Sequence, residues 1–71
     1  MSDVEREVLF LVNTSVADGI SSAFHASIAV IRRAIHVEQQ RDAPRVALIH
    51  GLKAELRRKE RAAAAEPKDA A

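Results

Sequence analysis

The apolar residues between positions 8 and 37 repeat with the period of an α-helix. When each residue is placed at steps of about 100° around a helix axis, the apolar and polar side chains separate into two opposite arcs. The arcs keep the same phase on both sides of Gly19, which a loop of arbitrary length would not preserve. The apolar arc comprises Val8, Val12, Val16, Ile20, Ala23, Phe24, Ser27, Ile28, Val30, Ile31, Ala34, Ile35 and Val37.

This pattern predicts one long helix over residues 3–41. Ser2 with Glu5 three positions later matches a capping box, so we expect the helix to begin near Asp3. Pro44 disfavours helical backbone in the residue before it, so residues 41–43 are expected to form a turn. A break near Gly19 is the alternative, because Asn, Ser, Asp and Gly cluster there as they do in loops.

A shorter helix is predicted over residues 44–63, with a narrow apolar stripe that includes Val46, Ile49, Leu52 and Leu56. Gly and Pro occur only twice each, which also favours helix. The fold class is therefore predicted to be all-α, with residues 1–63 forming one helical hairpin domain. From residue 64 the chain offers little to bury, and residues 64–71 are expected to be a disordered tail.

The two predicted helices differ greatly in length, about 57 Å against about 30 Å. The shorter helix could cover only half of the longer one, whose apolar arc of about 200° is wide enough for two neighbours. We therefore expect a homodimer that forms a helical bundle. The residues expected in the dimer interface are Val8, Val12, Val16, Ile20, Ala23, Phe24, Ser27 and Ile31.

Small residues recur every four positions along one flank of the long helix, at Ser15, Gly19, Ala23 and Ser27. Small side chains at this spacing let two helix backbones approach closely, so this flank is a candidate helix crossing. The alternative is that these are simply small residues on a helix surface.

At 71 residues without cysteine, the chain cannot gain stability from disulfides, which leaves oligomerisation as the usual route. The lack of cysteine and of a basic secretory leader favours a cytoplasmic protein. A membrane span is disfavoured, because Asp18 and several polar residues interrupt the apolar stretch.

The sequence gives little support for a catalytic or metal site. Asp18, Ser22 and His25 share one helix face, but a regular helix has no free N–H groups to form an oxyanion hole. His25, His36 and His50 lack the i, i+4 spacing of a zinc pair. We therefore expect no enzyme activity, no metal and no cofactor.

Basic residues are concentrated in the second helix, although the net charge of the chain is only +1. They either complement the helix dipole or form a patch that binds an acidic protein or nucleic-acid phosphates. No aromatic residue lies among them to stack on bases, which disfavours sequence-specific nucleic-acid recognition. The expected partner-binding residues are Leu9, Phe10, Lys53, Arg57, Arg58 and Arg61.

In size and predicted architecture the chain resembles two classes of small helical protein. One is the plasmid-type RNA-binding hairpin dimer, and the other comprises accessory proteins of temperate bacteriophages that bind and inhibit host regulators. The second resemblance implies a homodimeric interaction protein that inhibits or adapts another protein, such as a transcriptional regulator. The first implies the alternative, a nucleic-acid-binding dimer that uses the basic patch.

Overall fold

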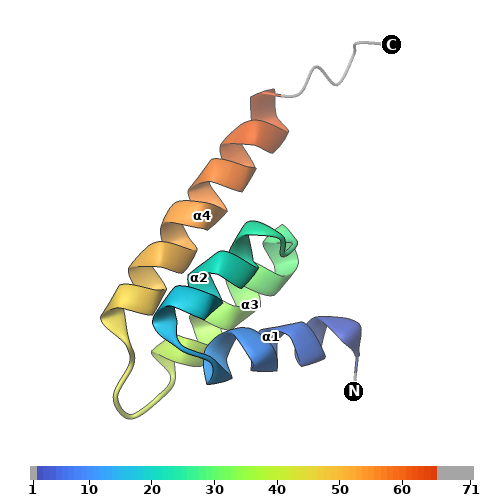
Figure 1. Ribbon diagram of the computed structural model, residues 1–71. Coiled ribbons are helices and arrows are strands. Elements are labelled where there is room, and N and C mark those ends of the chain that lie inside the picture. Colours follow the sequence, from blue (N-terminus) through green and yellow to red (C-terminus); the bar gives the residue numbers. More distant parts are fainter. Residues whose placement is uncertain (1, 66–71) are drawn as a thin grey trace.

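The computed structural model describes residues 2–65, which form four helices and no strand (Figure 1). The helices are α1 (Asp3–Asn13), α2 (Val16–Phe24), α3 (Ile28–Gln39) and α4 (Val46–Ala65). The predicted all-α class is confirmed for this part of the chain. No helix in it is both long and apolar enough to cross a membrane.

The prediction of one helix over residues 3–41 is wrong, because serine residues start three separate helices. The Ser2, Ser15 and Ser27 hydroxyls each accept a hydrogen bond from the backbone N–H three residues later, at 3.2, 3.1 and 3.2 Å. This geometry requires extended backbone at the cap, and the ψ angles of the three serines are 162°, 161° and 162°. The apolar arc does not stay on one buried face across the breaks, since Phe24 of the arc is exposed and Leu11, outside it, is buried. The alternative, a break in the cluster of loop-forming residues near Gly19, is closer to the structure, because the first connection lies at Thr14 and Ser15. Gly19 itself lies inside α2.

The predicted turn before Pro44 is present, and α4 begins two residues after that proline. Helix α4 continues to Ala65, two residues beyond the predicted end of the second helix. The rest of the predicted tail, residues 66–71, lies outside the described residues.

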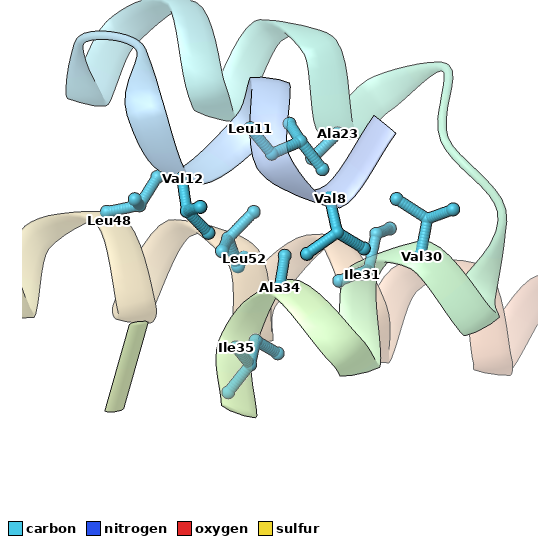
Figure 2. Packing of buried hydrophobic residues seen from close by; sticks show 10 residues of the cluster. All are labelled: Val8, Leu11, Val12, Ala23, Val30, Ile31, Ala34, Ile35, Leu48 and Leu52. Carbon is cyan, nitrogen blue, oxygen red and sulfur yellow. The ribbon is translucent and has the colours of Figure 1, made fainter. Parts of the chain in front are cut away.

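The helices form a ring in which α1 packs against α2 and α3, and α4 packs against the same two helices. Figure 1 shows the C-terminal end of α4 extending past the other helices. The buried apolar residues come from all four helices and converge on one core (Figure 2). The core comprises Val8, Leu11, Val12, Ala23, Val30, Ile31, Ala34, Ile35, Leu48 and Leu52.

This arrangement overturns the geometric argument for a dimer. The argument assumed that the N-terminal half of a straight helix would be bare, but the breaks after α1 and α2 let α1 fold back onto α3. Val8, Leu11 and Val12 are consequently buried within a single chain. The apolar face of residues 8–37 therefore needs no second copy to cover it.

Of the predicted flank of small residues, Gly19 lies at a helix crossing, with α4 of the same chain, whereas Ser15 and Ser27 cap helices. A Cβ atom at Gly19 would lie 2.9 Å from Leu48 Cδ1 and 3.0 Å from the Leu11 carbonyl oxygen. A Cβ atom at Gly51, on α4, would lie 2.3 Å from Ile20 Cδ1. Glycine on each helix thus allows α2 and α4 to approach closely.

We expect Gly19→Ala to lower the free energy of unfolding, although alanine favours helix by up to about 1 kcal/mol over glycine. The added methyl group meets a backbone oxygen that cannot rotate away, and such overpacking costs about 1–3 kcal/mol. Urea denaturation followed by circular dichroism measures the change. Ser21→Ala, on the exposed face of α2, is the matched control and should not destabilise the protein. A Gly19→Ala protein more stable than the wild type would contradict the close crossing.

Candidate functional site

A buried carboxylate lies where α1, α3 and α4 meet. Glu38, in the last turn of α3, is completely buried. Its Oε2 accepts hydrogen bonds from the Arg45 backbone N–H at 2.9 Å and from Arg45 Nε at 3.3 Å. Its Oε1 pairs with Arg45 Nη2 and with Arg41 Nε, both at 3.2 Å. The charge of Glu38 is thus compensated by two guanidinium groups.

The same two arginines cap the C-terminus of α1. Arg45 donates hydrogen bonds to the carbonyl oxygens of Val12 and Thr14 at 2.6 and 2.7 Å. Arg41 donates to the Val12 carbonyl oxygen at 2.7 Å and to Asn13 Oδ1 at 3.2 Å. The Val12 and Thr14 carbonyl oxygens belong to the end of a helix, where backbone carbonyl groups lack partners within the helix. The cluster of Glu38, Arg41 and Arg45 therefore joins three helices, and we assign it a structural role.

Burial alone would raise the pKa of Glu38. The hydrogen bonds donated by the Arg45 side chain and backbone N–H, together with the charges of Arg45 and Arg41, outweigh that effect. The net result is a pKa below the ordinary value of 4.5.

A surface groove with a volume of about 470 Å³ lies between α1 and α2. Its lining is mixed in charge and comprises Asp3, Arg6, Glu7, Phe10, Leu11, Ser22, His25 and Ala26. Phe10 is 59% exposed at the edge of this groove, and Leu9 beside it in the chain is 42% exposed. We call Leu9, Phe10 and the lining of this groove the α1 surface. Two of the predicted partner-binding residues, Leu9 and Phe10, are therefore exposed to solvent.

A second groove, of about 330 Å³, lies between α3 and α4. It is lined by Arg32, Ile35, Gln39, Lys53, Leu56 and Arg57, and we call it the α3–α4 groove. It includes two of the predicted partner-binding residues, Lys53 and Arg57. The structure does not bring these two residues together with Leu9 and Phe10 in one groove.

Other basic residues of α4 contact α2. The Arg58 guanidinium lies 4.6 Å from the centre of the Phe24 ring and pairs with Glu55. Lys59 Nζ donates a hydrogen bond of 2.7 Å to the Phe24 carbonyl oxygen, at the C-terminal end of α2. Arg61 is exposed. The basic cluster predicted from sequence is thus divided between a helix contact and the α3–α4 groove.

The residues predicted for the dimer interface lie mostly in the core of one chain. Val8, Val12, Ala23 and Ile31 are buried there, and Val16 and Ile20 pack against it. Ser27 caps α3, as described above. Phe24 is the exception, because it is 53% exposed, beneath Arg58. Among these residues, only Phe24 is available in this conformation as a large apolar contact for another molecule.

The structure does not keep Asp18, Ser22 and His25 together on one surface. Ser22 and His25 line the α1–α2 groove, whereas Asp18 lies in the first turn of α2 and is not part of that lining. Residues 2–65 contain no group of three or more histidine or acidic side chains placed to hold a metal ion.

Comparisons of the chain with protein families, with curated proteins and with solved structures found no match. The functional assignment therefore rests on the surfaces described above.

We expect Glu38→Gln to lower the free energy of unfolding at pH 7 and to lower it less at acidic pH. Because the folded carboxyl group has the lower pKa, its stabilising contribution is complete above the unfolded value near 4.5 and is lost as the pH falls through the folded value. Urea denaturation of both proteins from pH 7 to pH 3 measures this. A difference in unfolding free energy that is equal at the two ends of this range would contradict the ion pairing.

Proposed function

We propose that this chain is a small protein-binding module, which inhibits or adapts another protein by occupying part of its surface through the α1 surface. The observation that carries the proposal is the exposure of Leu9 and Phe10 on α1. This helix buries Val8, Leu11 and Val12 in the core and exposes Val4 as well. Burial of such side chains at an interface is strongly favourable, and exposed aromatic residues beside a groove are typical binding anchors.

The groove beside Phe10 supports a protein partner in particular. Asp3 and Glu7 add negative charge to its lining, while Arg6 and His25 can donate hydrogen bonds. A surface that combines apolar side chains with polar groups of both charges is usual for a protein interface. A transcriptional regulator, the partner class implied by the resemblance to phage accessory proteins, remains within this proposal.

The homodimer also remains a proposal, but it now rests on the exposed Leu9 and Phe10 and no longer on the apolar face of residues 8–37. An apolar surface can pair with its own copy around a two-fold axis, since each copy then contributes the same patch. The Leu9 and Phe10 side chains would face those of a second copy in such a pair.

Nucleic-acid binding through α4 has weaker support. Arg58 and Lys59 are engaged with Phe24 and Glu55, so fewer cations of α4 are available for phosphates. A protein that neutralises several phosphates shows a steep loss of affinity with salt.

The proposal is tested with a partner captured by the purified chain from its native host, identified by mass spectrometry and then purified. We expect Phe10→Ser to weaken binding by at least about thirtyfold, the loss that corresponds to about 2 kcal/mol at a binding hot spot. Phe24→Ser is the matched control, because Phe24 is similarly exposed but lies outside the α1 surface. Calorimetry that gives equal affinities for the wild type and Phe10→Ser would disprove the assignment.

Self-association is tested separately by sedimentation over a range of concentrations. If the α1 surface forms the dimer, Leu9→Ser combined with Phe10→Ser should be monomeric where the wild type is dimeric. Because both side chains are substantially exposed, the double variant should keep its stability within about 0.5 kcal/mol. A wild-type monomer at all concentrations would exclude the homodimer and leave binding to another protein in place.

A further inference from the structure

The α3–α4 groove combines an apolar floor with a cationic edge. Ile35 is buried at its base, and Leu56 packs against the core beside it. Arg32, Lys53 and Arg57 line the same groove, and Gln39 adds an amide that can both donate and accept hydrogen bonds. No acidic side chain is among the lining residues. An occupant therefore needs apolar groups in the centre and negative charge around them.

The cations of this groove are only partly compensated. Arg32 pairs with Glu60, one helical turn beyond Leu56 on α4. Within residues 2–65, Lys53 and Arg57 make no ion pair. They differ in this respect from Arg41, Arg45 and Arg58, whose guanidinium groups are paired with glutamates. The groove thus retains a positive charge that a ligand can neutralise.

A further exposed apolar residue extends this side of α4. Val46 is 59% exposed and precedes Lys53 by seven positions, which places both on the same face of the helix. Val46 and Leu56 are ten residues apart, about 15 Å along α4. This is longer than the about 10.5 Å over which positions i to i+7 of a bound helix present their side chains, so this side of α4 is long enough for such a helix.

We propose that the α3–α4 groove binds an acidic amphipathic helix of a partner protein, with apolar side chains on Ile35 and Leu56 and carboxylates facing Arg32, Lys53 and Arg57. The charge of the groove selects an acidic ligand. Its apolar floor favours a peptide over nucleic acid, because a phosphate backbone has no apolar side chain to bury there. The inference adds a second surface to the proposed protein-binding function. It does not depend on the α1 surface, since the two grooves share no lining residue.

The experiment uses the full chain and a fluorescent synthetic helix, in which leucine at positions i, i+3, i+4 and i+7 is flanked by glutamate. A peptide of the same composition in scrambled order and a DNA duplex of similar charge are the comparison probes. Fluorescence anisotropy at several salt concentrations measures affinity, and amide chemical shifts map the bound surface. We expect the patterned peptide to bind at least about tenfold more tightly than the scrambled one, a difference of about 1.4 kcal/mol. The shifted amides should include Gln39, Lys53 and Arg57.

Charge reversal provides the matched control. Lys53→Glu combined with Arg57→Glu should weaken binding of the patterned peptide at least about tenfold, since carboxylates would then face carboxylates. Arg33→Glu combined with Arg61→Glu makes the same change in net charge at exposed residues outside the groove, and should change the affinity less than about threefold. Circular dichroism confirms that both variants are folded.

Three results would overturn the proposal. The first is an equal loss of affinity in the two charge-reversed proteins. The second is that the patterned peptide, the scrambled peptide and DNA bind equally well. The third is that the patterned peptide does not bind. The test is separate from that of the proposed function, because Leu9→Ser with Phe10→Ser should bind the patterned peptide as the wild type does. Loss of peptide binding in that variant would also contradict the assignment to the α3–α4 groove.

Discussion

The path of the chain depends on how Glu38 is held by Arg41 and Arg45. A buried charge without a partner is costly, and removal of one member of a buried pair destabilises proteins by about 3–5 kcal/mol. Here both arginines also hydrogen-bond the carbonyl oxygens at the end of α1. The cluster therefore compensates a charge and at the same time fixes the point at which the chain turns after α1, so that α1 packs on α3. Burial of Val8 and Val12, and with it the outward direction of Leu9 and Phe10, follows from that turn.

The helical content and the turn before Pro44 could be predicted from local pattern, and so could the start of the first helix at Asp3. The breaks at Ser15 and Ser27 could not be predicted from the sequence, because a serine that caps a helix and a serine on a helix surface can have the same local sequence. A capping hydrogen bond contributes only about 1 kcal/mol, so tertiary packing decides between them. Here packing of α1 on α3 favours the broken helix.

The candidate surfaces were predictable to different degrees. Leu9 and Phe10 could be named from the sequence, and both are exposed. Glu38 was missed, although its position four residues after Ala34 places a charged residue on the buried side of α3. The separation of Lys53 and Arg57 from Arg58 and Lys59 required knowledge of where α2 lies. The two pairs share one helix, but the contacts of Phe24 with Arg58 and Lys59 give them different neighbours.

The shortness of the first three helices has a consequence for synthesis of the protein. Helices α1, α2 and α3 have 11, 9 and 12 residues, and isolated helices of this size are marginal in water. Each depends on neighbours, and α4, which covers both α2 and α3, is the last helix of the described chain to leave the ribosome. A nascent chain that lacks α4 would therefore leave the buried faces of α2 and α3, which include Ala23 and Ile31, without their full set of neighbours. Folding is expected to be completed only after translation has passed α4, in one cooperative step.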